Sequence, residues 1–163
     1  MSRTRTTPFA LSLLCGLVAC SSVHTERVIA APPEVVWQVI TDPAGYGAWN
    51  PVIYKVEGEF EEGAELLNHL REPDGREYTI TSSVREMRPA EELYQVGGPF
   101  WILEFHNRYQ LEPVAGGTKV IQHEDYRGIA VPFWNHDWIE PAYARMLEGL
   151  EQRVSELSGG GSQ

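Results

Sequence analysis

Cysteine is scarce in this sequence, with only Cys15 and Cys20 among 163 residues. Both lie near the amino terminus, so the rest of the chain has no disulfide framework, no cysteine nucleophile and no cysteine-based zinc site. The folded part must therefore rely on a packed core. The residues from Cys20 to Gln163 are numerous enough for one ordinary domain with such a core.

Basic residues are also few, with 13 Lys and Arg against 23 Asp and Glu and a formal net charge of −10. Such a surface repels nucleic acid and anionic lipid headgroups. No basic patch or RNA-binding motif is present, so nucleic-acid binding is not expected. We interpret the acidity as a solubility feature rather than as a cation site.

The apolar segment at Phe9–Ala19 is too short to span a bilayer, which needs about 20 residues. Because Arg3 and Arg5 precede it, the segment is typical of a secretory signal. Its end, Leu17-Val18-Ala19-Cys20, resembles a bacterial lipobox, in which the cysteine is lipidated and becomes the first mature residue. The alternative is an ordinary signal in which Cys20 is incidental.

We therefore predict a lipoprotein signal peptide over residues 1–19 and a membrane anchor on lipidated Cys20. Ser21 after the cysteine favours transit to the outer membrane, facing the periplasm. Residues 20–25 are expected to form a short tether, 26–157 one domain, and 158–163 a flexible tail rich in glycine and serine.

The pattern of the domain predicts one strand and two short helices, then several strands and a long helix. The first strand is Glu26–Ala30. The first helix, Glu34–Thr41, is opened by Pro33 and stopped by Asp42-Pro43. A second short helix or loop covers Ala44–Asn50. Period-two segments follow at Val52–Gly58, Glu65–Glu72, Glu77–Met87, Leu93–Val96, Ile102–Glu112 and Thr118–Arg127. An apolar stripe at helical spacing from Ile139 to Leu157 predicts the final helix.

The strands at 102–112 and 118–127 form a hairpin whose register can be predicted. Pairing Pro113 with Thr118 gives three complementary pairs on the outer face: Glu112 with Lys119, His106 with Asp125, and Glu104 with Arg127. The inner pairs are then Leu111 with Val120, Tyr109 with Gln122, Asn107 with Glu124, and Phe105 with Tyr126. Since an unpaired carboxylate in a core is costly, inward-facing Glu124 indicates a pocket.

The order of these elements resembles the START-like (SRPBCC) superfamily, in its polyketide cyclase/dehydrase and lipid transport subgroup. The similarity is carried by Pro33 and Trp37, Asp42-Pro43, Tyr46-x-x-Trp49-Asn50-Pro51, Leu111-Glu112-Pro113, Gly116-Gly117-Thr118 and Glu124-x-Tyr126-x-Gly128. It covers about residues 26–157. Gln122 departs from the pattern, because many relatives have histidine there.

The resemblance implies an α+β helix-grip fold. In this fold, a curved antiparallel sheet of about seven strands curls around a long C-terminal helix and leaves an apolar cavity between them. Two short N-terminal helices complete the fold. The ligand cavity is expected to involve Leu103, Phe105, Asn107, Tyr109, Val120, Gln122, Glu124, Tyr126, Trp134, Trp138 and Met146. Leu150 is expected beside Met146. Trp49 and Trp101 are either part of the cavity mouth or plain packing, whereas Trp37 is expected in the core.

No catalytic or cofactor motif is present, since G-x-S-x-G, Walker A and G-x-G-x-x-G are all missing. No cofactor and no metal are therefore expected. A metal site from His106, His123 and Asp125 is the alternative, but solvated outer-face side chains explain them better.

Three functions stay open. The preferred one is binding or carrying a small hydrophobic molecule. The second is an enzyme of the cyclase, dehydratase or hydrolase type that uses Glu124 with Tyr109 or Tyr126. The third is a ligand-free module that interacts with proteins. Glu124 itself can be a ligand-binding group, a general acid or base, or a structural hydrogen-bonding group.

Overall fold

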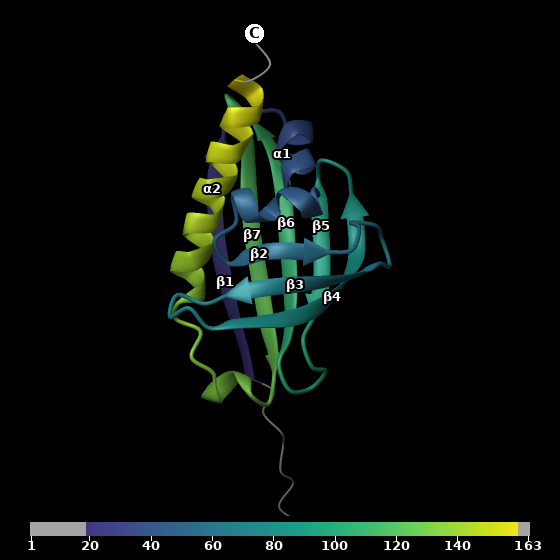
Figure 1. Cartoon of the computed structure of the whole chain (residues 1–163), viewed down its shortest axis with the longest axis vertical. Coiled ribbons are helices and arrows are strands. Elements are labelled where there is room, and N and C mark those ends of the chain that lie inside the picture. Colours follow the sequence, from purple (N-terminus) through teal and green to yellow (C-terminus); the bar gives the residue numbers. More distant parts are fainter. Residues whose placement is uncertain (1–18, 160–163) are drawn as a thin grey trace, which may run out of the picture.

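The structure, a computed structural model, describes residues 19–159 (Figure 1). One antiparallel sheet has the strand order β1-β7-β6-β5-β4-β3-β2. The strands are β1 (Ala19–Ile29), β2 (Ile53–Glu57), β3 (Glu65–Arg71), β4 (Glu77–Arg88), β5 (Glu92–Gly97), β6 (Glu104–Val114) and β7 (Gly117–Gly128). The helices are α1 (Pro33–Ile40), α2 (Ile139–Gly159) and two 3₁₀ helices at Pro43–Ala48 and Val131–Phe133. The predicted helix-grip fold is confirmed.

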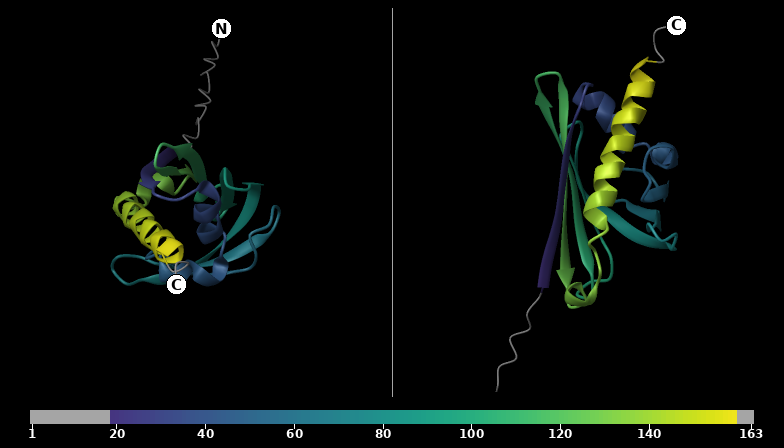
Figure 2. Two further views of the ribbon diagram at one scale, coloured as in Figure 1. Left: turned by 90° about the horizontal axis from the view of Figure 1, so that it is seen from above. Right: turned by 90° about the vertical axis from the view of Figure 1, so that its left-hand side faces the viewer.

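The sheet is strongly curved. Strands β1, β7, β6 and β5 run along the long axis, whereas β2, β3 and β4 cross in front of them (Figure 1). The register between β4 and β5 shifts between Val84 and Glu86, which marks a bulge where such a bend is favoured. The sheet thereby curls around the interior, with α2 along its open side (Figure 2).

Helix α2 begins where its sequence pattern predicts. Pro141 lies in the first turn, where its missing N–H is not needed. The buried side chains recur at helical spacing and are Ile139, Ala142, Met146, Leu147, Leu150 and Val154. At Gly149 the helix comes very close to the chain after the first 3₁₀ helix, since an added Cβ would lie 2.1 Å from the Trp49 carbonyl oxygen.

The buried core has two parts. The larger cluster fills the α1 end and includes Val36, Ile40, Leu111 and Leu150. The smaller cluster lies around the second 3₁₀ helix and consists of Val23, Tyr126, Val131 and Ile139. No helix among residues 19–159 is long and apolar enough to cross a membrane.

The β6–β7 hairpin has the predicted register at every pair, from Pro113 opposite Thr118 to Glu104 opposite Arg127. Of the three outer charge pairs, only Lys119 with Glu112 is an ion pair, at 3.9 Å. His106 instead bonds the Tyr94 hydroxyl at 2.8 Å. The inner face of the hairpin is therefore the one expected. The other two outer pairs lie opposite each other across the strands without forming an ion pair.

Strand β1 corrects the expectation of a tether over residues 20–25. Those residues pair with β7 one by one, from Cys20 opposite Arg127 to Thr25 opposite Gln122. The reason is a period-two pattern that reaches farther back than expected, since Val23 is 5% exposed and Thr25 is 9% exposed. The predicted strand Glu26–Ala30 is only the later part of β1. The predicted signal at 1–19 lies outside the described residues except for Ala19, and of the predicted tail, residues 160–163 lie outside them.

Candidate functional site

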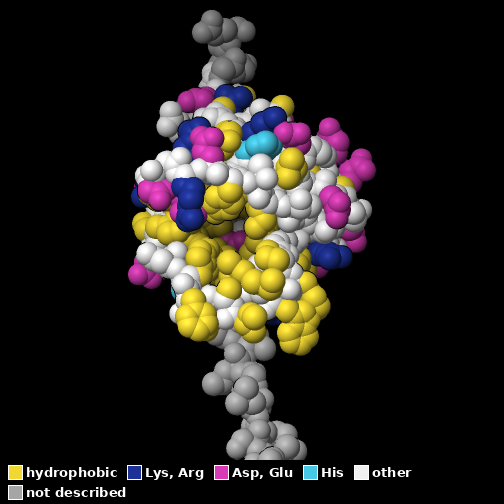
Figure 3. Space-filling view, turned by 60° about the horizontal axis from the view of Figure 1, so that its bottom comes forward, with side chains coloured by type: hydrophobic (Ala, Val, Ile, Leu, Met, Phe, Trp, Pro, Cys, Tyr) yellow, Lys and Arg dark blue, Asp and Glu magenta, His cyan; other side chains and the backbone are white. Residues whose placement is uncertain are grey.

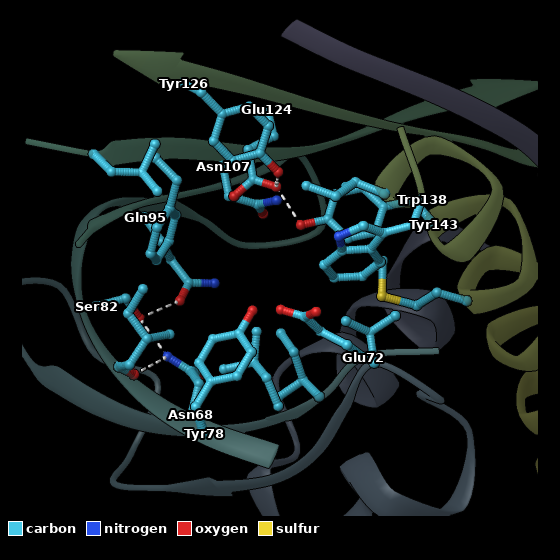
Figure 4. Close-up of a pocket in the computed structure, with 18 of the residues that line it drawn as sticks. Asn68, Glu72, Tyr78, Ser82, Gln95, Asn107, Glu124, Tyr126, Trp138 and Tyr143 are labelled. Carbon is cyan, nitrogen blue, oxygen red and sulfur yellow. Dashed lines mark hydrogen bonds between the residues drawn. The ribbon is translucent and has the colours of Figure 1, made fainter. Parts of the chain in front are cut away.

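A pocket of about 370 Å³ lies between the inner face of the curved sheet and α2. Members of both core clusters line it, so the pocket occupies the interior where the clusters meet. Figure 4 shows polar side chains from β3, β4, β5, β6 and β7 pointing into it, opposite Tyr143 of α2. The wall is mainly apolar, as in most small-molecule sites.

The structure places almost all of the predicted cavity residues in this wall. They are Leu103, Phe105, Asn107, Tyr109, Gln122, Glu124, Tyr126, Trp134, Trp138 and Met146. The hairpin residues among them follow from the confirmed register, because successive strand residues alternate between the two faces.

Two residues expected in the wall do not line the pocket. Val120 and Leu150 are both 0% exposed and belong to the larger core cluster. They do face inward, but in the half of the interior that α1 and Leu111 fill. Their expected place in the cavity was wrong. The periodicity of a strand or helix predicts which face a side chain is on, but not where along that face the cavity lies.

Glu124 is the central polar group of the pocket and is 4% exposed. Its Oε2 accepts a hydrogen bond from the Tyr126 hydroxyl at 2.6 Å and another from the Tyr143 hydroxyl (Figure 4). Burial raises the pKa of Glu124 above its usual value near 4.5, and hydrogen bonds from both tyrosines and Asn107 partly oppose that shift. Glu124 is therefore held in place and is biased toward its neutral form.

The tyrosines around Glu124 act as hydrogen-bond donors. Burial and the charge of Glu124 raise the pKa of both Tyr126 and Tyr143, so their hydroxyls stay protonated. Tyr109, in contrast, points its hydroxyl at the Met146 sulfur, at 3.5 Å. It lines the pocket without contacting the carboxylate through a hydrogen bond.

A second polar group comes from the strands at the other side of the pocket. The Asn68 Nδ2 donates to Ser82 Oγ at 2.9 Å, and Ser82 Oγ donates to Gln95 Oε1 at 3.0 Å (Figure 4). All three side chains are buried. Their polar atoms lie on the other side of the pocket from Glu124. A ligand can therefore form hydrogen bonds at two separate points, which would fix its orientation.

Gln122 is a wall residue with a fully buried side-chain atom that lacks a partner. Its side chain is 1% exposed, and its Oε1 makes no hydrogen bond. A buried carbonyl oxygen without a partner costs about 1–3 kcal/mol. Protein atoms cover this oxygen, so the Gln122 side chain contributes to the wall without offering this atom to a ligand.

The β3–β4 hairpin forms part of the pocket rim. Buried Glu72 pairs with Arg76, with 2.5 Å between Oε2 and Nη2. Tyr78 lies beside them, and burial together with Glu72 raises its pKa to about 12. The guanidinium thus neutralises the carboxylate that borders the opening.

The tryptophans have different positions. Trp134 and Trp138 line the pocket, between β7 and α2. Trp37 and Trp49 are buried in the larger core cluster, and Trp101 is 62% exposed outside the pocket wall. Aromatic residues thus form part of the wall, but only two of the tryptophans take part in it.

Several wall residues were missed by the sequence analysis. In the sequence Tyr143 is one member of the apolar helix stripe, and its contact with Glu124 has no signal there. The polar residues of the middle strands, Asn68, Ser82 and Gln95, do carry a signal, because each alternates with outward-facing neighbours.

The side chains of the alternative metal site, His106, His123 and Asp125, do not point toward a common centre. His106 bonds Tyr94, whereas His123 lies 3.2 Å from Asp125. Among residues 19–159, no group of three or more histidine, cysteine, aspartate or glutamate side chains is arranged to hold a metal ion. Cys20 is exposed at the start of β1.

The curved sheet, the long helix and the pocket between them define a helix-grip protein with an internal cavity. The chain belongs to the polyketide cyclase/dehydrase and lipid transport family, whose model matches residues 21–155. No curated protein sequence matches the chain.

Solved structures show the same fold. Protein CV1439 from Chromobacterium violaceum is 18% identical with a TM-score of 0.69, covering 82% of this chain and 96% of its own. A protein from Rhodobacter sphaeroides is 20% identical with a TM-score of 0.68, covering 86% and 99%. Ara h 8.0201 is 15% identical with a TM-score of 0.66, covering 85% and 99%. At these identities the similarity concerns the fold alone.

Proposed function

We propose that the protein binds and carries a small, mainly apolar molecule that also bears a hydrogen-bonding group. The observation that carries this proposal is the pocket of about 370 Å³, whose mainly apolar wall contains the buried carboxyl group of Glu124 and the polar side chains of Asn68, Ser82 and Gln95. The family description, which includes lipid transport, is consistent with this function.

The polar groups of the pocket suggest how such a ligand is held. A hydroxyl or amine of the ligand contacts neutral Glu124, while the chain formed by Asn68, Ser82 and Gln95 offers a second contact. Because most of the wall is apolar, the body of the ligand supplies the affinity and these groups supply the orientation.

Carrying is favoured over catalysis by the contacts of Glu124. Two tyrosine hydroxyls already occupy one of its oxygens, and Tyr109 donates to a sulfur instead. A module that interacts only with proteins would need no open interior, so the pocket volume argues against it.

We further propose that the protein acts while attached to a membrane through lipid on Cys20. The support is the sequence Leu17-Val18-Ala19-Cys20 after a short apolar segment, together with the exposed position of Cys20. Ser21 favours the periplasmic side of the outer membrane as the site of attachment.

Native mass spectrometry of the purified protein tests the binding function. The expected result is a co-purifying small molecule that is released on denaturation and extracts into organic solvent. An empty protein that also fails to take up any apolar compound from a panel would contradict the proposal. Conversion of a panel compound to a product of different mass would favour the enzyme alternative.

A further inference from the structure

Five large apolar side chains are exposed at the end of the molecule where the described chain begins. Their exposed fractions are 70% for Phe100, 62% for Trp101, 51% for Ile102, 62% for Ile129 and 89% for Phe133. They belong to two loops, 97–103 and 128–134, neither of which contains a charged residue. We call these five side chains the apolar end patch. An exposed cluster of this kind commonly marks an interaction surface.

The two loops form one continuous surface. The Ile129 N–H donates to the Trp101 carbonyl at 3.0 Å, and the Ala130 N–H donates to the Ile102 carbonyl at 2.9 Å. The contact is close, since a Cβ at Gly128 would lie 2.3 Å from the Ile102 oxygen. Figure 3 shows apolar side chains gathered on this face of the molecule around a hollow.

The same loops border the pocket. In the first loop, Pro99 and Leu103 line the pocket, and the three exposed side chains lie between them. In the second loop, Trp134 lines the pocket directly after exposed Phe133. A surface that binds the apolar end patch would therefore also face the pocket opening.

The start of β1 lies at this end as well. Cys20 is opposite Arg127, next to the residues that begin the second loop. Ser21 Oγ lies 2.7 Å from His136 Nε2, and His136 stacks on Trp134 at 5.3 Å. Since Cys20 itself already pairs with Arg127 of β7, a lipid on Cys20 would hold the apolar end patch against the membrane with no intervening tether.

We propose that the apolar end patch inserts into the surface of a lipid bilayer, so that the pocket opens toward the membrane. The ligand then moves between the bilayer and the pocket without crossing water. We assign the apolar end patch to a bilayer rather than to another partner because Cys20 lies at the same end of the molecule. This inference therefore rests on the proposed anchoring. Aromatic side chains such as Trp101 and Phe133 also suit the membrane interface.

The test uses the full chain, produced in a Gram-negative host and reconstituted in vesicles of phosphatidylethanolamine and phosphatidylglycerol. Phe133→Cys carries an environment-sensitive fluorophore, and Ala115→Cys at the exposed turn between β6 and β7 is the matched control. The expected result is a blue-shifted emission at position 133 that spin-labelled acyl chains quench, with water-like emission at position 115. Water-like emission at both positions of the anchored protein would overturn the proposal.

Two further outcomes separate the alternatives. A blue shift that rises with the amount of protein per vesicle, without quenching by labelled lipid, would assign the patch to a second copy and overturn the proposal. The chain without an added cysteine is expected to take no label, because acylated Cys20 has no free thiol. Labelling of that chain would contradict the anchoring itself, and with it the membrane as occupant.

A functional arm measures transfer of a fluorescent fatty acid from the anchored protein into the bilayer that holds it, which contains a quencher lipid. The double substitution Phe100→Ser with Phe133→Ser is expected to slow transfer at least about tenfold, since each side chain contributes apolar area to the bilayer contact. Val114→Ser with Leu157→Ser changes exposed apolar side chains elsewhere and is expected to leave transfer unchanged. Equal rates in both double variants would overturn the proposal.

Discussion

At the scale of single residues, Glu124 is the group whose surroundings depart most from those of an ordinary side chain. It is buried, its pKa is raised, and two tyrosines with raised pKa values donate to it. A carboxyl group with a raised folded-state pKa stabilises the fold fully below its usual value near 4.5. That stability is lost as the pH rises through the folded-state pKa.

Glu124→Gln removes this titration while its amide oxygen can still accept from Tyr126 and Tyr143. We expect the variant to gain stability relative to the unchanged protein as the pH rises above 4.5. The difference in unfolding free energy should change by at most about 1.4 kcal/mol per pH unit. Urea unfolding at a series of pH values measures it. A difference that does not depend on pH would mean that Glu124 ionises like an exposed carboxyl group.

Tyr109 provides a residue-scale test of the cavity itself. Tyr109→Trp places a larger ring in the wall beside Met146, where space is available. We expect binding of an apolar fluorescent probe to weaken, with a loss of stability below about 1.5 kcal/mol. Tyr54→Trp on β2, outside the pocket wall, is the control. Any probe that binds the exposed apolar end patch does so equally in both variants, because neither substitution changes that patch. Loss of several kcal/mol without a change in probe binding would indicate a filled interior.

At the scale of elements, the packing of α2 against the sheet depends on Gly149. Alanine in a helix is normally more stable than glycine by about 1 kcal/mol. Here a Cβ would meet the Trp49 carbonyl oxygen at 2.1 Å, so Gly149→Ala must move the helix or the loop. We therefore expect a lower melting temperature and, because Met146 lies one turn away, weaker probe binding. Exposed Ser155→Ala on the same helix should not lower the melting temperature, and a stabilised Gly149→Ala would contradict the tight approach of α2.

The elements also show what the sequence could and could not predict. The inner face of the β6–β7 hairpin was predictable, because strand parity and opposite charges across the strands fix a register. The extent of the cavity was not. Val120 and Leu150 face inward but are covered by α1 and its neighbours, and Tyr143 reaches Glu124 only because α2 packs beside the sheet with this residue facing the interior. These contacts depend on how the bent sheet meets the helix, which no local pattern encodes.

At the scale of the whole molecule, one end of the fold brings together the features that concern a membrane. The start of β1 lies there with loops 97–103 and 128–134, which carry the apolar end patch and border the pocket, whereas the β6–β7 turn and the end of α2 lie at the opposite end (Figures 1 and 2). The direction of β1 therefore decides which way the pocket faces once Cys20 is held. Because the strand pairs with β7 from its first residue, the domain cannot turn freely about its anchor.

Cys20→Ala tests the anchor on which this orientation depends. We expect the variant to leave the membrane fraction or to remain unprocessed, because its thiol can no longer be acylated and stable attachment needs more than one acyl chain. Fractionation of cells and intact-mass measurement of the purified protein give the result. Ser22→Ala, close by in the same strand, keeps the thiol and should stay in the membrane fraction with the mass of a lipidated chain. Unchanged mass and attachment in Cys20→Ala would show that Cys20 is incidental. The apolar end patch would then have to bind the bilayer without a covalent lipid anchor on Cys20.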